Sequence, residues 1–227
     1  MSWDMVGNEK KSNKGDDVKY LKFEEGTTII RLLDEAPESY FSHWIARAQG
    51  GKGIGIACCG KGCPICEEMR KEKAQKVDYT SRKWARPIKH MINVLVKKSN
   101  GKDINEVMVL EQGNGLFGQI KEQMTLLSTM GMSTNLMDYD IIINRTGTGF
   151  GDTKYSVMVN PMGMKPLTDE EKALKKYDLT AIKPAYTPEQ IIMYMNGSTF
   201  DEVNAIENKD IEQPVNATHG MDFSDPF

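Results

Sequence analysis

The sequence predicts a mainly β (α+β) protein, built around a small antiparallel barrel with a few helices. Short segments rich in β-branched residues follow one another without the strand–helix alternation of a doubly wound sheet. Asn100-Gly101 between two of these segments is a typical hairpin signal. Hydrophobic residues make up 39% of the 227 residues and charged residues 27%, which predicts a folded core, 18–198, between a flexible N-terminal arm, 1–17, and a disordered acidic tail, 199–227.

The elements of this core are expected in a fixed order. Strands are predicted at 20–23, 27–33, 40–48, 54–58, 89–98, 106–110, 138–144 and 154–160. Helices are predicted at 67–76, 116–130, 168–177 and 187–195. Thr168 and Glu171 form the capping box of the third helix. The apolar residues of 116–130, including Phe117, Met124 and Met130, recur at helical spacing and are assigned to the core.

The charge is divided unevenly along the chain. A net charge of -3 and a pI near 5.7 would by themselves argue against a nucleic-acid partner. Residues 199–227 hold seven acidic residues and one basic residue, so the tail carries -6 and the rest of the chain +3. A mildly basic body with an acidic tail is compatible with DNA binding if the basic residues are concentrated in one place.

Other features limit where the protein acts. No apolar run approaches the roughly 18 residues of a membrane span, so no membrane partner is expected. The first residues lack the apolar stretch of a secretory signal. All four cysteines lie within 58–66, which suits a metal site in a reducing compartment better than disulfides. We expect a cytoplasmic protein, in the host bacterial cytoplasm if a phage encodes it.

The sharpest local motif is CCGKGCPIC at 58–66. A C-x-x-C pair presents two thiolates to one tetrahedral ion, and zinc prefers sulfur and nitrogen donors, so Cys63 and Cys66 are expected ligands. Cys58 and Cys59 alternate across a strand, and we expect one of them to bind: Cys59 is favoured, with His43 as fourth ligand and Cys58 as substitute. Four ligands would make one structural Zn²⁺ site. A redox pair or a plain thiol cluster is the alternative.

Basic and aromatic residues are interleaved in three segments. Binding of single-stranded nucleic acid without sequence preference needs a cationic groove and aromatic faces on which bases stack. The segments are Tyr79, Arg82, Lys83, Trp84, Arg86 and Lys89; Tyr40, Phe41, Trp44 and Arg47; and Arg145, Phe150, Lys154 and Tyr155. Trp84 is the best stacking candidate, whereas Trp44 could instead pack under the metal site. Only one of Lys154 and Tyr155 is expected to meet DNA, and core packing is the alternative for each aromatic residue.

Three stretches of the chain match one family pattern. They are His43-Trp44 before Cys59-x3-Cys63-Pro-Ile-Cys66, the segment 20–33, and the segment 145–157. Together they resemble the zinc-containing single-stranded-DNA-binding proteins of tailed phages over roughly 18–160. The resemblance implies an OB-fold barrel with an inserted zinc subdomain at about 40–80. It also implies a non-enzymatic protein that coats single-stranded DNA during phage DNA replication, recombination and repair. The doubled Cys58-Cys59 departs from the single leading cysteine of the family.

The two ends of the chain add two resemblances. The last residues, MDFSDPF, resemble the tip of bacterial single-stranded-DNA-binding proteins, which docks replication and repair partners. An apolar pocket with a basic rim would accept such a tip. The tip residues are Asp222, Phe223, Asp225, Pro226 and Phe227; an ordinary acidic tail is the alternative. The basic run at 10–14 resembles a stretch that carries self-association along DNA in some phage members.

Two other functions are weighed against DNA coating. The glycine-rich loop 147–151 lacks the Lys-Ser/Thr ending of a phosphate loop, and the sequence offers no constellation for a hydrolase. The chain is therefore expected not to be an enzyme. A zinc-ribbon protein-binding or transcription-regulatory factor would share the cysteine motif but would not need the basic residues of 82–89.

Overall fold

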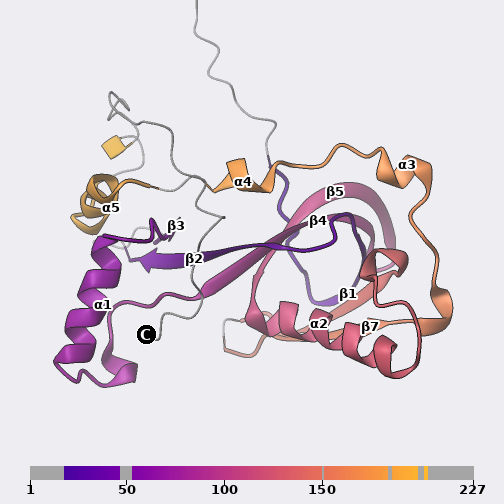
Figure 1. Ribbon diagram of the computed structural model, residues 1–227, viewed down its shortest axis with the longest axis horizontal. Coiled ribbons are helices and arrows are strands. Elements are labelled where there is room, and N and C mark those ends of the chain that lie inside the picture. Colours follow the sequence, from indigo (N-terminus) through magenta and orange to yellow (C-terminus); the bar gives the residue numbers. More distant parts are fainter. Residues whose placement is uncertain (1–17, 47–52, 150, 184–185, 199–201, 204–227) are drawn as a thin grey trace, which may run out of the picture.

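The computed structural model describes residues 18–46, 53–149, 151–183, 186–198 and 202–203. These residues form an antiparallel seven-stranded sheet with a few helices, so the prediction of a mainly β (α+β) protein is confirmed (Figure 1). The predicted arm, nearly all of the predicted tail, Arg47 and Phe150 lie outside the described residues. Among the helices that are described, none is long and apolar enough to cross a membrane.

Seven of the eight predicted strands are present in the predicted order, with shifted ends; the predicted strand at 20–23 is not, and Tyr20 forms only an isolated bridge with Val109. The strands are β1 (Gly26–Leu32), β2 (Glu38–Ile45), β3 (Ile54–Ala57), β4 (Ile88–Ser99), β5 (Lys102–Gly113), β6 (Ile141–Thr146) and β7 (Lys154–Val159). The helices are α1 (Pro64–Ala74), α2 (Asn114–Thr129), α3 (Asp169–Lys172), α4 (Leu179–Ile182) and α5 (Pro188–Met195), with 3₁₀ turns η3 (Tyr79–Ser81), η4 (Leu136–Asp138) and η5 (Pro161–Gly163).

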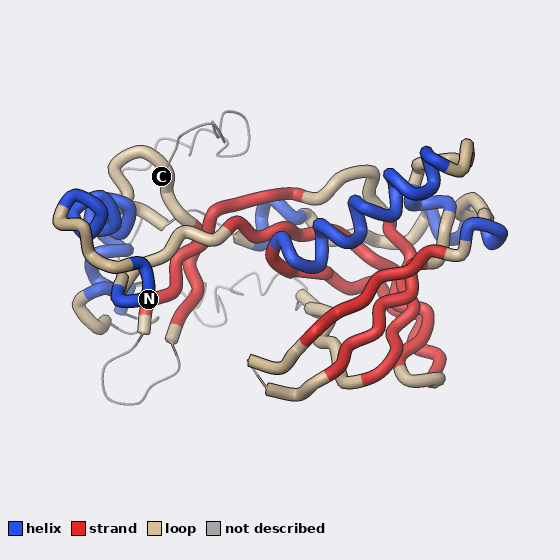
Figure 2. Tube along the Cα trace, turned by 90° about the horizontal axis from the view of Figure 1, so that it is seen from below, coloured by secondary structure: helices blue, strands red, loops and turns tan. Residues whose placement is uncertain are grey.

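Strand β4 connects two lobes of the molecule (Figure 2). Its first residues pair with β2, its last residues pair with β1, and β5 pairs along its length. The large lobe contains β1, β4, β5, β6, β7 and α2, and its core includes Ile30, Val94 and Ile143. The small lobe contains the end of β2 with β3, α1 and α5, and it has a second core around Ile56 and Ile65.

The large lobe is a curved, barrel-like sheet whose outer strands, β5 and β7, both contact α2. Gln119 of α2 donates a hydrogen bond of 3.0 Å to the carbonyl of Tyr155, and the Gln123 carboxamide accepts one of 3.2 Å from the Val159 N–H. The segment before β1 pairs with the edge of β5, through the Leu21 N–H and the Val109 carbonyl at 2.9 Å. Because unpaired strand edges invite association, these contacts protect both edges of the lobe.

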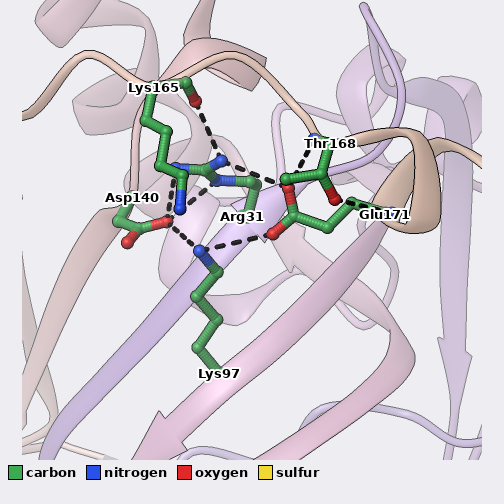
Figure 3. Close-up of polar contacts among 6 residues, drawn as sticks. All are labelled: Arg31, Lys97, Asp140, Lys165, Thr168 and Glu171. Carbon is green, nitrogen blue, oxygen red and sulfur yellow. Dashed lines mark hydrogen bonds and ion pairs between the residues drawn. The ribbon is translucent and has the colours of Figure 1, made fainter.

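A strap of chain after β7 runs back over the sheet to the small lobe and carries α3, α4 and α5 (Figure 1). It is anchored at Arg31, whose side chain is only 1% exposed. The guanidinium donates to the Asp140 carboxylate at 2.8 Å and to the Lys165 carbonyl at 2.9 Å (Figure 3). Lys97 lies 2.9 Å from Asp140 and 3.5 Å from Glu171, the capping residue of α3. We call these two cations and two carboxylates the ionic cluster.

Some predicted elements differ in extent, each for a local reason. Helix α1 begins at Pro64, not at 67, because proline is tolerated in the first turn of a helix. The capping box of Thr168 and Glu171 is confirmed, but α3 ends at Lys172 rather than at 177. On α2 the predicted core residues Met124 and Met130 are exposed, whereas Phe117 is buried, so the assignment of the whole apolar stripe to the core was wrong.

Candidate metal centre and nucleic-acid interface

Four side chains of the small lobe converge on one point. The ligand atoms of His43, Cys58, Cys63 and Cys66 all lie within 4.8 Å of one another, and all four residues are buried. The Cys58 and Cys66 sulfurs are 3.6 Å apart, and His43 Nε2 is 3.5 Å from the sulfurs of Cys63 and Cys66. Zinc–sulfur bonds of about 2.3 Å in a tetrahedron place sulfurs roughly 3.7 Å apart. The geometry and the donor set therefore fit a tetrahedral metal ion.

The local sequence explains why these atoms meet. His43 on β2 points inward, and the Ala85 carbonyl 2.9 Å from its Nδ1 orients Nε2 toward the sulfurs. Cys58 follows β3, Cys63 is the N-cap of α1, and Cys66 lies in the first turn of that helix. Gly60, with a φ of 78°, allows the tight turn between them, and its N–H lies 3.4 Å from the Cys58 sulfur.

The preference for Cys59 over Cys58 is corrected by this geometry. Cys58, the residue kept as substitute, brings its buried sulfur into the four-atom group, and Cys59 does not belong to it. The two residues are neighbours in extended chain, so their side chains point in different directions. Cys59 is half-buried beside the cluster. The predicted roles of His43, Cys63 and Cys66 fit the observed group.

The side chains of the cluster also shift one another's pKa values. Hydrogen bonding with Cys58 lowers the pKa of the Cys63 thiol and raises the pKa of the Cys66 thiol. Burial lowers the pKa of His43, but hydrogen bonds with Cys58 and Cys63 outweigh it and raise that pKa to about 9. Without a metal, the cluster thus favours a negative Cys63 beside a protonated imidazole. A bound divalent cation supplies the charge that three thiolates and a neutral imidazole require.

Of the two tryptophans in the described region, the favoured stacking candidate is buried and the other one is exposed. Trp84, the favoured stacking candidate, is only 9% exposed and belongs to the core of the small lobe. Lys83 lies over its ring, with Nζ 4.7 Å from the centroid. Trp44, next to the inward His43 on β2, points outward and is 61% exposed. Strand alternation explains why Trp44 faces away from His43, because adjacent residues face opposite sides of the strand.

The ring of Trp44 lies over two glycines at β3. A Cβ built on Gly53 would come within 2.4 Å of Trp44 Cζ2, and one on Gly55 would lie 3.7 Å from Cε3. A side chain at Gly53 would therefore collide with the indole. These glycines let one face of the ring rest on the backbone, while much of the side chain stays exposed. Neither glycine was among the predicted site residues.

The basic residues are most concentrated between 70 and 89. This segment holds eight basic and two acidic residues, a net charge of +6. Tyr79 on η3 is 80% exposed, and the Arg82 guanidinium lies 5.7 Å from its ring centroid. Arg82 and Lys83 are exposed. The basic residues of α1 were not among the predicted site residues, although counting charges over this window would have found them; they are Arg70, Lys71 and Lys73, followed by Lys76.

Several other predicted DNA-binding residues are held by internal contacts. The Tyr40 hydroxyl donates to Glu111 at 2.8 Å, and burial raises the pKa of Tyr40. The Arg86 guanidinium lies 3.9 Å from the ring centroid of Phe41, and Lys89 on β4 is half-buried. These contacts tie Tyr40 and Arg86 to the junction of the two lobes.

Of the predicted DNA-binding residues described in the β6–β7 hairpin, two make internal contacts and one is exposed. Arg145 donates to the carbonyls of Phe23 and Thr148 and to the Thr153 hydroxyl, so it braces the hairpin. Tyr155 packs edge-on against Phe23, with ring centroids 5.4 Å apart. Lys154 is exposed. Lys154 is therefore the residue of the alternating pair that is available to a ligand.

Comparison with known proteins identifies the family of the chain. A search of curated proteins gives no match. A family model described as gp32 DNA binding protein like matches residues 22–193. The matched region includes both lobes, the Cys–His group, the basic segment and the strap, and the family supports single-stranded DNA as the partner. Since the match covers about three quarters of the chain, the protein belongs to the gp32-like family of DNA-binding proteins.

Proposed function

We propose that this protein coats single-stranded DNA without sequence preference, and that it does so during phage DNA replication, recombination and repair. The observation that carries the proposal is the +6 segment at 70–89, with exposed Tyr79, in the same lobe as exposed Trp44. Clustered cations attract the phosphate backbone, and exposed rings accept any base. Binding of this kind needs no catalytic group.

The ion of the small lobe is proposed to be Zn²⁺ in a structural role. Three cysteines and one histidine are zinc donors, and the four protein ligands would leave no open position for a substrate. His43 and Trp44 are consecutive on β2. An ion that fixes His43 would therefore also fix the strand that presents Trp44.

The ends of the chain are proposed to add protein contacts. Asp222, Phe223, Asp225, Pro226 and Phe227 would dock replication or recombination proteins, and the basic run at 10–14 would support self-association along DNA. Deleting 221–227 is expected to abolish partner docking while the affinity for DNA is kept or raised, because an acidic tail competes for basic sites. Loss of DNA binding on deletion would contradict this assignment.

The DNA-binding surface is tested by replacing its exposed residues. Trp44→Ala removes one stacking platform, and we expect oligo(dT) affinity to fall by about 1–3 kcal/mol, the range for one stacked base. Arg82→Ala with Lys83→Ala should lower the dependence of log K on log[salt] by about 2, one for each phosphate contact. Met162→Ala is the control, because Met162 is exposed on η5, outside these segments.

The same experiment separates DNA coating from a protein-binding zinc-ribbon factor. The measurement is fluorescence anisotropy of labelled oligo(dT) over a series of salt concentrations. If Trp44→Ala and the Arg82/Lys83 double variant both bind as tightly as the wild type, the small lobe does not bind DNA. The zinc-ribbon interpretation, which leaves this surface unused, would then be preferred.

A further inference from the structure

A second surface feature lies in the large lobe, where the end of β5 and the start of α2 face β7. It is a groove of about 530 Å³. Its lining residues are Gln112, Gly113, Gly115, Leu116, Gln119, Thr153, Lys154 and Tyr155. None of these is acidic, whereas four other cavities formed by described residues each include at least one Asp or Glu. A phosphate entering this groove therefore meets no carboxylate in its lining.

The lining of the groove contains one exposed lysine and a glycine with open space beside it. Lys154 is exposed on β7, and its ammonium is a compact, flexible partner for phosphate. A Cβ built on Gly115 would have no heavy atom within 4 Å. The floor of the groove is thus bare backbone that a ligand can approach closely. Gln119 holds the β7 side of the groove in place through its hydrogen bond to the Tyr155 carbonyl.

The end of the basic segment pairs with one of the groove-lining residues. Lys89, the last residue of the 70–89 segment, is the register partner of Gly113 across the β4–β5 ladder. Gly113 in turn lines the groove that Lys154 lines from the opposite side. Two residues that are far apart in sequence, Lys89 and Lys154, are thereby brought to one end of the same lobe.

We propose that this groove binds the phosphodiester backbone of the single strand that the small lobe binds, so that one strand passes from the basic segment past Lys89 to Lys154. The proposal rests on the proposed function and extends the binding site to the large lobe. Gln112, Gly113 and Gly115 become part of the DNA site, with Lys154 as its phosphate contact and the glycines as the residues that keep the path open.

The test places a negative charge in the groove. Gly115→Glu adds a carboxylate to its floor, and Gly118→Glu adds the same charge one turn later on α2, where the glycine lines a different cavity. Neither glycine has a positive φ, and glutamate favours a helix more than glycine does, so both variants should fold. We expect oligo(dT) of about 16 nucleotides, the upper site size of one OB fold, to reach the groove.

Gly115→Glu should weaken the binding of this oligonucleotide about tenfold through like-charge repulsion, and Gly118→Glu should change it less than about twofold. Lys154→Ala should lower the salt dependence by about 1, whereas Lys121→Ala, an exposed lysine of α2 outside the groove, should not. If wild type does not bind oligo(dT), the proposed function fails. If wild type binds, but Gly115→Glu equals Gly118→Glu or Lys154→Ala equals Lys121→Ala, the groove proposal is overturned and the proposed function stands.

Discussion

Each lobe of this molecule contains a polar cluster, and the charges of the two clusters are balanced in different ways. The ionic cluster of the large lobe contains Arg31 and Lys97 against Asp140 and Glu171, so its charges balance within the chain. The Cys–His group of the small lobe has three sulfurs and one imidazole, and three thiolates with a neutral imidazole would be neutralised by a bound divalent cation. We therefore expect the large lobe to fold without a ligand and the small lobe to depend on a bound metal ion.

Three of the four residues of the Cys–His group also belong to the core of the small lobe. The ligands Cys58, Cys63 and Cys66 make up a considerable part of the small-lobe core, together with Trp84 and residues of α5. The core of the large lobe contains none of these ligands. Losing the metal should therefore loosen the lobe that carries Trp44 and the basic segment, while the large lobe keeps its fold.

The largest expected effect is the loss of the metal through a single ligand. Cys58→Ser should abolish stoichiometric metal binding and unfold the small lobe, since metal binding to a structural site contributes several kcal/mol to folding. Cys59→Ser, the matched control on the neighbouring residue, should keep one ion per chain. Metal content by mass spectrometry and hydrogen exchange of α1 and β4 check both variants.

Exchange should speed up in α1 of Cys58→Ser and stay slow in the β4–β5 ladder, where the strands pair along their length. Equal metal content in the two variants would reverse the assignment of Cys58. Equal loosening of both lobes would show that the large lobe also depends on the metal, and the contrast between the clusters would be lost.

A smaller loss is expected when the ionic cluster is broken. Arg31→Met removes the buried cation, which leaves Asp140 and Glu171 with Lys97 alone. Removing one partner of a buried ion pair costs about 3–5 kcal/mol, and we expect the low end because Asp140 is partly exposed. The measurement is the free energy of unfolding in urea.

The control for Arg31→Met is a surface pair of the same lobe. Lys98 lies 3.2 Å from Asp103, and both side chains are well exposed, so Lys98→Met should cost less than about 1 kcal/mol. Equal losses for the two variants would show that the ionic cluster contributes no more than an ordinary surface ion pair.

The smallest expected effect is on how the free energy of unfolding depends on pH below about 4.5, to which Glu171 of the ionic cluster contributes. Burial would raise the pKa of Glu171, but the Thr168 N–H and the charges of Lys97 and Arg31 outweigh it, so that pKa is lowered. A carboxylate with a lowered folded-state pKa contributes stability above its unfolded pKa of about 4.5 and loses it as the pH falls through the folded value. Glu171→Gln should therefore reduce the loss of stability below about pH 4.5.

The comparison is made by urea unfolding of wild type and Glu171→Gln between pH 6 and pH 3, with β4 amide signals as the probe of the large lobe. If the free energy of unfolding falls equally with pH in wild type and in Glu171→Gln, folding does not lower the pKa of Glu171. A Glu170→Gln control separates the neighbouring carboxylate, which lies in the first turn of α3 but takes no part in the ionic cluster.

Local patterns predicted most of the elements. Asn100-Gly101 makes the two-residue turn between β4 and β5, with φ values of 48° and 80°, as its sequence indicates. The cysteine spacing predicted the metal group apart from the choice between Cys58 and Cys59. That choice depends on the direction of each sulfur, which follows from how the chain leaves β3 and which spacing alone does not contain.

Contacts between residues far apart in the sequence explain what local patterns did not predict. Trp84 lies between basic residues in sequence, yet α5, about a hundred residues later, helps to bury it. Arg145 belongs to a basic and aromatic segment, but the Phe23 carbonyl takes one of its donors. The ionic cluster joins Arg31 to Glu171 over 140 positions, and no pattern in a short window of sequence predicts that pairing.

The proposed function requires that this chain binds single strands in preference to duplex. The most direct measurement is anisotropy titration of the metal-loaded, full-length protein with labelled oligo(dT) and with a duplex of the same length, over a series of salt concentrations. We expect the single strand to bind much more tightly than the duplex, with an affinity that falls steeply as salt increases. Equal affinity for the duplex, or no binding at low salt, would contradict the proposed function.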